Sequence, residues 1–318
     1  MALLAVDIGG TNARFAAFEL DATGSPRMGE TVWLETGAAS SLMDLLSQLP
    51  AAGFDFDLAN FKAIVMAAPG PVENGVRVRM ANVSWEIDIT PLKERYPGSP
   101  SFLINDFVAQ AYGCKTRAVE DAEMIQSGTA VESSIMAVIG AGTGLGHCSI
   151  VPDSRGGLVA LPSEAGHAAF PFSGDRETDY LNFLLAETGK PYAYGDLVVS
   201  GRGLALVHRF LTGENLTPAE AADRISETSE TTAWFARFYA RACRNYALTV
   251  LPLAGLFVSG GVAARNPFLV QNDYFRKEFV DSPNYLDLLQ RIPIRLNTNQ
   301  QTGLYGAALY GALSLKSG

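Results

Sequence analysis

Two glycine-rich stretches carry the residue types in this chain that are most suited to chemistry. The letters DIGGTN occupy positions 7–12 and the letters GAGTGLG occupy positions 140–146, and each stretch follows or ends a run of apolar residues. Because glycine adopts backbone conformations that other residues avoid, a tight turn after a buried strand can point several N–H groups at one anion. Two such turns predict a triphosphate that is held from both sides. The candidate phosphate-binding residues are Gly9, Gly10, Thr11, Asn12, Gly140, Gly142, Thr143 and Gly144.

Two polar residues, Asn105 and Asp106, follow the mostly apolar run at 101–104. In open α/β sheets ligands bind at the carboxyl ends of strands, where such a run would deliver both side chains. A kinase needs one carboxylate that accepts a hydroxyl proton, and Asp106 is the candidate for that role. Asn and Asp are also common N-caps of helices, so a purely structural role stays open.

Glu164 and His167 lie in a loop with the letters SEAGH at positions 163–167. A Glu and a His three positions apart could ligate a metal, but no third ligand falls at a useful spacing. A carboxylate that accepts hydrogen bonds and an imidazole that donates or accepts them also suit a polyhydroxylated ligand. The other interpretation is that His167 is a structural residue with satisfied hydrogen bonds.

Gly260 and Gly261 follow a third buried strand, which the apolar run predicts at 256–259. Adjacent glycines let the main chain approach a flat ligand closely, which makes this pair the candidate nucleoside contact. A tight turn that starts a helix explains the same two residues equally well.

The elements that must position these residues mix strands with helices. Buried strands are predicted at 15–20 and 61–68, alternating residues at 76–80 predict an edge strand, and apolar spacing predicts a helix at 41–49. Strands and helices mixed at this spacing predict an α/β domain.

The chain after the SEAGH loop is predicted to be mainly helical. The letters TPAE at 217–220 form a capping-box pattern, with Pro at the first helical position. Aromatic residues recur at helical spacing through 230–251, which indicates a face that packs in the core. A final helix at 302–315 is rich in Gly and Ala and should pack closely, against the first domain.

Composition excludes several classes of protein. The chain has 318 residues, 48% of them hydrophobic and 18% charged, which is ordinary for a globular protein of two domains. A net charge of −9, with Lys and Arg scattered, argues against binding to nucleic acid or to a membrane surface. The three cysteines lack C-x-x-C spacing, which indicates a reduced, cytoplasmic chain. We predict no signal peptide and no membrane-spanning segment.

Two other nucleotide-binding motifs do not match the sequence. The chain has no G-x-x-x-x-G-K-[ST], which excludes a P-loop. The glycine run at 140–146 looks superficially like a dinucleotide fingerprint, but a strand-like segment follows it where that motif requires a helix.

Taken together, these motifs resemble the bacterial glucokinases of the proteobacterial type, within the hexokinase/actin-like ATPase superfamily. The resemblance spans nearly the whole chain, with the motifs in family order. The stretches that carry it are DIGGTNAR at 7–14, INDF at 104–107, GAGTGLG at 140–146, EAGH at 164–167 and SGG at 259–261.

The resemblance implies an α/β chain of two domains, the actin-like ATPase (ribonuclease H-like) fold, with a cleft between the domains. A small domain would comprise 1–106 and 300–318, and a large domain would comprise 107–299. The implied reaction transfers the γ-phosphoryl group of ATP, with Mg²⁺, to the 6-hydroxyl of D-glucose and yields glucose 6-phosphate and ADP for glycolysis. A homodimer is also implied.

The resemblance assigns the sugar side of the site position by position. Asp106 matches the general base, and Asn105 matches its sugar-binding neighbour. Glu164 and His167 match contacts to sugar hydroxyls. Asp196 falls where the family has a second sugar-contacting glutamate, and it is one methylene shorter, which leaves the sugar preference open.

The resemblance also assigns the nucleotide side. The two glycine turns match the phosphate loops, and Gly260 with Gly261 matches the adenosine side. Asp7 would be a direct or indirect partner of Mg²⁺. A second departure from the family pattern lies in the EAGH stretch, where Ala165 replaces a glycine.

Three alternatives differ from this interpretation in features that can be checked. Kinases of the repressor/open-reading-frame/kinase (ROK) group share similar motifs but carry a cysteine-rich zinc motif after the His, and residues 168–178 contain no Cys. A sugar-responsive transcription factor would need a helix-turn-helix before the first strand and a basic surface. An actin-like filament or ATPase-switch protein would not need the polar residues that match the sugar side.

Overall fold

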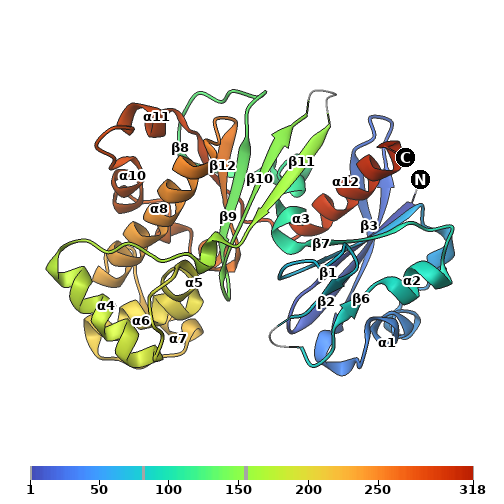
Figure 1. The fold of residues 1–318 in the computed structure, drawn as a ribbon, viewed down its shortest axis with the longest axis horizontal. Helices are drawn as coiled ribbons and strands as arrows, with labels where there is room; N and C mark the ends of the chain where they lie inside the picture. Colours follow the sequence, from blue (N-terminus) through green and yellow to red (C-terminus); the bar gives the residue numbers. More distant parts are fainter. Residues whose placement is uncertain (1, 81–82, 154–156, 318) are drawn as a thin grey trace. The chain divides into compact units, whose positions relative to one another are not determined.

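The computed structural model describes residues 2–80, 83–153 and 157–317. The chain divides into two compact units (Figure 1). Unit 1 comprises Met1–Glu120 and Gln301–Gly318, and unit 2 comprises Asp121–Gln300. Unit 1 therefore extends beyond position 106, where the sequence predicts the end of the small domain. The reason is that the helix beginning at this position packs within unit 1.

Unit 1 contains a five-stranded sheet with the order β3-β2-β1-β4-β7. Its strands are β1 Ala2–Ile8, β2 Asn12–Leu20, β3 Pro26–Glu35, β4 Ala63–Ala68 and β7 Ser101–Asn105. β4 lies between β1 and β7 and runs parallel to both, whereas β2 pairs antiparallel with β1 and with β3. The strands predicted at 15–20 and 61–68 are confirmed as β2 and β4.

The edge strand predicted at 76–80 is shorter than expected. Only Arg77–Val78 forms strand β5, which pairs with β6 (Ile87–Asp88) in a separate two-stranded sheet. A salt bridge of 2.9 Å between Arg77 and Asp88 also joins these two strands.

Helix α12 (Thr302–Ser317) brings the end of the chain back to unit 1, where it packs against α3 (Asp106–Gly113) and across β1 and β4. The two helices meet through glycine: a Cβ atom on Gly306 would lie 1.7 Å from the carbonyl oxygen of Ala109. The close packing predicted for the final helix is therefore confirmed. The other helical segments of this unit are η1 Thr36–Ala38, α1 Leu42–Ser47, η2 Pro50–Ala52, η3 Leu58–Asn60, α2 Thr90–Arg95 and η4 Arg117–Val119.

Unit 2 contains a six-stranded sheet with the order β11-β10-β9-β12-β13-β8. Its strands are β8 Glu123–Gln126, β9 Met136–Ala141, β10 Leu145–Pro152, β11 Leu158–Ser163, β12 Gly255–Ser259 and β13 Ile294–Leu296. β12 runs parallel to β9 and β13, whereas β10 pairs antiparallel with β9 and β11. A strand does follow the second glycine-rich stretch, as the sequence predicts.

The long helix α8 (Glu230–Val250) forms the core of unit 2, because its aromatic face is buried as predicted. Trp234, Phe235, Phe238 and Tyr239 are each no more than 4% exposed. The capping box predicted at 217–220 is present at the start of α7. The other helical segments are η5 Ala165–His167, α4 Gly174–Thr188, α5 Gly195–Val198, α6 Gly201–Thr212, α7 Pro218–Arg224, α9 Gly261–Arg265, η6 Pro267–Leu269, α10 Asp273–Val280 and α11 Leu286–Arg291.

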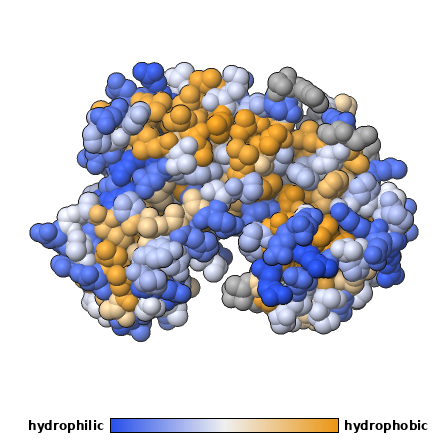
Figure 2. Space-filling view, viewed as in Figure 1, coloured by the Kyte–Doolittle hydropathy of each residue, from blue (hydrophilic) through white to orange (hydrophobic). Residues whose placement is uncertain are grey.

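Apolar side chains also reach the surface of unit 2. Figure 2 shows hydrophobic residues, in orange, gathered where the strands of the six-stranded sheet lie. On the edge strand β11, Val159 and Leu161 are 47% and 48% exposed. Among the residues that the structure describes, no helix is both long and apolar enough to cross a membrane.

Candidate functional site

In unit 1 the candidate residues gather at the carboxyl edge of the parallel strands. The strand register places Asp7 on β1 opposite Ala67 on β4, and the next residue of β4, Ala68, opposite Asn105 at the end of β7. Neighbouring strands lie about 4.8 Å apart, so β1 and β7 are separated by about 10 Å. Asp7, the turn that follows it, and Asn105 with Asp106 therefore share one edge of this sheet.

The first glycine turn (Gly9–Asn12) joins β1 to β2 and is held by hydrogen bonds of its own backbone. The N–H of Gly9 donates to the carbonyl oxygen of Asn12 at 2.9 Å. Thr36, the residue directly after β3, also supports the turn. Its hydroxyl donates to the Gly9 carbonyl at 2.8 Å, and its N–H donates to the Thr11 carbonyl at 2.9 Å. Gly10, Thr11 and Asn12 are exposed, which leaves this turn accessible to a ligand.

Asp7 has a partner that the sequence analysis missed. Its carboxylate forms an ion pair with the guanidinium of Arg14, which lies opposite it in the antiparallel pair of β1 and β2. The guanidinium also lies over the ring of Trp33, 5.3 Å from its centroid. The register of a tight hairpin around the first glycine turn was the signal that could have revealed this pair.

Asn105 and Asp106 form the junction between β7 and α3. Asn105 is the N-cap, as one interpretation predicts: its side-chain oxygen accepts from the N–H groups of Phe107 at 2.8 Å and Val108 at 3.2 Å. Its amide donates to the Gly70 carbonyl at 3.2 Å. The carboxylate of Asp106 accepts from the N–H of Phe107 at 2.9 Å, at a helix end whose dipole favours negative charge.

In unit 2 the second glycine turn (Gly140–Gly146) lies beside the glycine pair Gly260–Gly261. Gly140 on β9 is opposite Ser259 on β12, and the hydroxyl of Tyr239 joins the two strands, since it accepts from the Ala141 N–H at 3.0 Å and donates to the Ser259 carbonyl at 3.2 Å. Gly260 has a φ of +91°, and a Cβ there would lie 2.4 Å from the Ala141 oxygen. This packing requires glycine at position 260.

Gly260 and Gly261 also start a helix, because α9 begins at Gly261 with Gly260 as its N-cap. The structural interpretation of this glycine pair is thus confirmed. Its contact with a nucleoside stays a prediction.

The EAGH loop (Glu164–His167) leaves β11 at the same edge of the sheet as the second glycine turn. The register pairs His147 near the start of β10 with Ser163 at the end of β11. The side chains of Glu164 and His167 are both exposed, and that of His167 is 63% exposed. These side chains are thus accessible to a ligand with hydroxyl groups.

Asp196, in the first turn of α5, lies between these two segments. Its Oδ1 accepts from the N–H of Leu145 at 2.8 Å. Its Oδ2 lies 3.9 Å from Nε2 of His167. Local sequence patterns do not indicate the contact with Leu145, since 51 positions separate the two residues.

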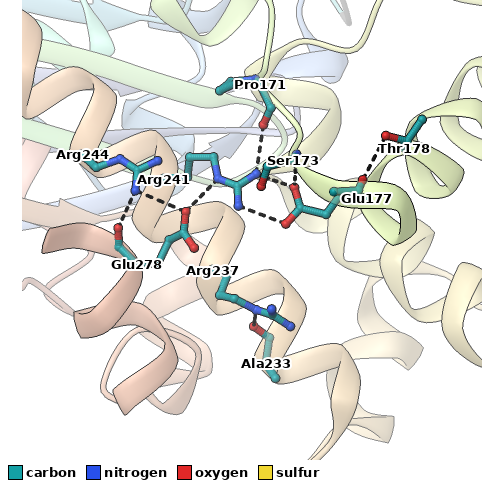
Figure 3. A network of polar contacts seen from close by, with 10 residues as sticks. Pro171, Ser173, Glu177, Thr178, Ala233, Arg237, Arg241, Arg244 and Glu278 are labelled. Atoms are coloured by element: carbon teal, nitrogen blue, oxygen red, sulfur yellow. Dashed lines mark hydrogen bonds and ion pairs between the residues drawn. The ribbon is translucent and has the colours of Figure 1, made fainter. Parts of the chain in front are cut away.

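A buried ion-pair network holds the chain that continues from the EAGH loop (Figure 3). Arg241 on α8 donates to the Pro171 carbonyl at 3.0 Å, to Glu177 on α4 at 2.6 and 3.0 Å, and to Glu278 on α10 at 2.8 Å. Burial lowers the pKa of Arg241 and the hydrogen bonds to both carboxylates raise it, with a net shift upward. Arg244 also bonds to the carbonyl of Glu278, at 2.8 Å.

The candidate metal ligand is the carboxylate of Asp7. The residues that the structure describes contain no group of three or more His, Cys, Asp or Glu side chains placed to hold a metal ion. Mg²⁺ commonly keeps several waters and binds through one or two carboxylates plus substrate phosphates. Asp7, beside an exposed glycine turn, fits this mode, with Arg14 as the competing positive charge.

Comparison with known proteins gives a consistent result. The chain matches the family model described as Glucokinase over residues 4–314. A glucokinase of Nitrobacter hamburgensis is 30% identical over 313 residues, which cover 95% of this chain and 94% of that protein. A glucokinase of Nostoc punctiforme is 28% identical over 343 residues, which cover 98% of each chain.

Solved structures confirm the predicted fold. A glucokinase from an Antarctic psychrotroph superposes with a TM-score of 0.81 at 26% identity, covering 97% of this chain and 98% of that chain. A ROK hexokinase from Thermus thermophilus superposes with a TM-score of 0.67 at 20% identity, covering all of both chains. The α/β chain thus has the two-domain actin-like fold.

The glycine turns, the Asn-Asp junction and the EAGH loop all lie within the matched residues, at the carboxyl ends of β1, β7, β9 and β12 or beside them. The resemblance predicted from these motifs is confirmed, and the chain belongs to the glucokinase family.

Proposed function

We propose that this enzyme transfers the γ-phosphoryl group of ATP to the 6-hydroxyl of D-glucose, giving glucose 6-phosphate and ADP at the entry to glycolysis. The observation that supports this most strongly is the grouping of site residues within each unit. Unit 1 combines a glycine turn with Asp106, and unit 2 combines a glycine turn with the exposed polar side chains of the EAGH loop. Phosphoryl transfer needs this combination of anion binding and hydroxyl positioning more than it needs covalent chemistry.

On the sugar side, Asn105, Glu164, His167 and Asp196 would bind hydroxyl groups, and Asp106 would act as the general base. The carboxylate of Asp106 is held at the N-terminus of α3 by the Phe107 N–H at 2.9 Å, which orients it. It would accept the hydroxyl proton as the new P–O bond forms.

On the nucleotide side, the two glycine turns would contact the phosphates, and Gly260 with Gly261 would contact the adenosine. When bound with ATP, Mg²⁺ would neutralise phosphate charge. Asp7 would hold the ion directly or through water, and Arg14 would balance the charge of that carboxylate in its absence.

A homodimer in the cytoplasm is the assembly and location that we propose. The exposed Val159 and Leu161 on the edge strand β11 support self-association, because exposed apolar edge strands favour pairing with another chain. All three cysteines lie within the described residues, are buried and form no disulfide there, as in proteins of reducing compartments. Analytical ultracentrifugation measures the assembly directly.

An assay of ADP release over a panel of hexoses and amino sugars tests the proposed reaction. We expect release that depends on sugar and is fastest with glucose. A preference for mannose, fructose or glucosamine would instead identify a related hexose or amino-sugar kinase. Release that is independent of sugar would favour an actin-like ATPase switch, and pelleting after addition of ATP would then test for filaments.

A further inference from the structure

We propose that Asp196 is a positioning residue that links the second glycine turn to the EAGH loop, and thereby couples nucleotide binding to sugar binding. This inference rests on the proposed function, because it takes the turn as a phosphate contact and the loop as a sugar contact. It assigns to Asp196 a role on the nucleotide side in addition to the sugar contact expected from its position in the sequence.

The contact with the glycine turn is direct. Oδ1 of Asp196 accepts from the N–H of Leu145 at 2.8 Å, at the point where the turn enters β10. A Cβ atom on Gly144 would lie 2.6 Å from Oδ2 and 3.1 Å from Cγ of Asp196, and its three nearest neighbours are all atoms of this side chain. The carboxylate therefore occupies the space that a side chain at position 144 would need.

The same carboxylate contacts the EAGH loop. A Cβ atom on Gly166 would lie 2.3 Å from Oδ1 of Asp196 and 2.2 Å from the Leu145 carbonyl oxygen. Oδ2 lies 3.9 Å from Nε2 of His167. One carboxylate, 24% exposed, is thus packed between two backbone segments that meet it at glycines, Gly144 and Gly166.

This packing predicts coupling between the two ligands. Because the backbone at Gly144 and Gly166 meets the same carboxylate, a sugar that orders the EAGH loop also restricts the glycine turn. A ligand that orders a segment in advance reduces the cost for the second ligand, and the effect on the two affinities is reciprocal. Glucose should therefore tighten binding of the nucleotide.

Calorimetric titration of the full chain with Mg²⁺ and AMPPNP, an ATP analogue that is not hydrolysed, measures this coupling. We expect saturating glucose to lower the Kd of AMPPNP about fivefold or more in the unaltered protein, the lower end of typical couplings. Asp196→Ala should bring this ratio to about one. Asp196→Asn, which keeps an oxygen for the Leu145 N–H, should retain most of the ratio.

The matched control is Asp175→Ala, which removes an exposed aspartate from the first turn of α4 and should leave the ratio unchanged. An unchanged ratio in Asp196→Ala, or a ratio of one in the unaltered protein, would overturn the inference. If the unaltered protein phosphorylates glucose, the proposed function stands in either case. If it neither binds nor phosphorylates glucose, the proposed function itself fails and the inference fails with it.

A second pair of variants tests the packing without relying on Asp196→Ala alone. Gly144→Ala places a methyl group against the carboxylate and should raise the KM for ATP several-fold in the unaltered background. In the Asp196→Ala background the same change should have no further effect, since its steric partner is gone. Equal effects of Gly144→Ala in both backgrounds would refute the contact.

Discussion

At the scale of single residues, Asp106 is the side chain on which the proposed chemistry depends. Asp106→Asn keeps an oxygen for the Phe107 N–H but removes the proton acceptor. We expect kcat to fall by about 10²–10⁴ while the Kd for glucose changes little, the usual scale for loss of a general base. Steady-state kinetics and calorimetry measure the two quantities, with Asp175→Asn as the exposed control. Normal turnover by Asp106→Asn would mean that another group accepts the proton.

His147 predicts a pH dependence of stability. Burial lowers the pKa of His147 to about 4, and a hydrogen bond with the Leu145 backbone acts in the opposite direction. Its Nδ1 is buried with no hydrogen-bond partner among the described residues, and its ring packs on that of Tyr246 with the centroids 4.7 Å apart. Below its ordinary pKa of 6.5 the unfolded chain binds a proton that the folded chain excludes.

The stability contributed by neutral His147 is therefore complete above pH 6.5 and is lost as the pH falls toward 4. At 1.36 kcal/mol per pH unit, the free energy of unfolding falls by about 3 kcal/mol between pH 6.5 and pH 4. Urea denaturation at several pH values measures it, and His147→Phe should show a shallower acid decline. Parallel declines in the two proteins would rule out His147 as the source.

At the scale of elements, the contact between α3 and α12 depends on glycine. Gly306→Ala would place a methyl group 1.7 Å from the Ala109 oxygen and 2.4 Å from the Gly113 nitrogen, so the helices must separate. Overpacking of this kind costs about 1–3 kcal/mol. Gly201→Ala at the start of α6 is the control, because its nearest neighbour would lie at 3.5 Å. Equal unfolding free energies for the two variants would contradict the close contact.

The Arg241 network joins three helices and predicts a second stability effect. Arg241→Met would remove the buried cation from the carboxylates of Glu177 and Glu278, which are 13% and 12% exposed, and Glu278 would keep its 3.4 Å ion pair with Arg244. Breaking a buried pair in this way costs about 3–5 kcal/mol. Adding Glu177→Gln and Glu278→Gln to the same chain should restore part of the loss, as thermal unfolding would show. If the triple variant is no more stable than Arg241→Met, unpaired charge is not the cause.

At the scale of the whole molecule, glucose should stabilise the folded chain. A ligand that binds only the native state at 100 times its Kd adds about 2.7 kcal/mol to the free energy of unfolding. Differential scanning calorimetry would detect this as a higher Tm. Sorbitol, which has the hydroxyl groups but no ring, is the matched control. An equal shift with sorbitol would indicate a solvent effect and would argue against a glucose site.

Local patterns in the sequence determined much of this protein. The strands that lead into each glycine turn, the N-cap role of Asn105, the capping box at the start of α7 and the buried aromatic face of α8 were all predicted. Each depends on backbone conformation or on residue periodicity within one or two turns of chain, which the order of residues encodes directly. The family motifs could be recognised for the same reason.

Only the tertiary structure decided the contacts between distant segments. Leu145 and Asp196 are 51 positions apart, and Arg241 reaches carboxylates 64 and 37 positions away. Asp196 was predicted only because it falls where the family has a glutamate, and no role was predicted for Arg241. Such contacts arise from strand order and helix packing, so no local propensity contains them.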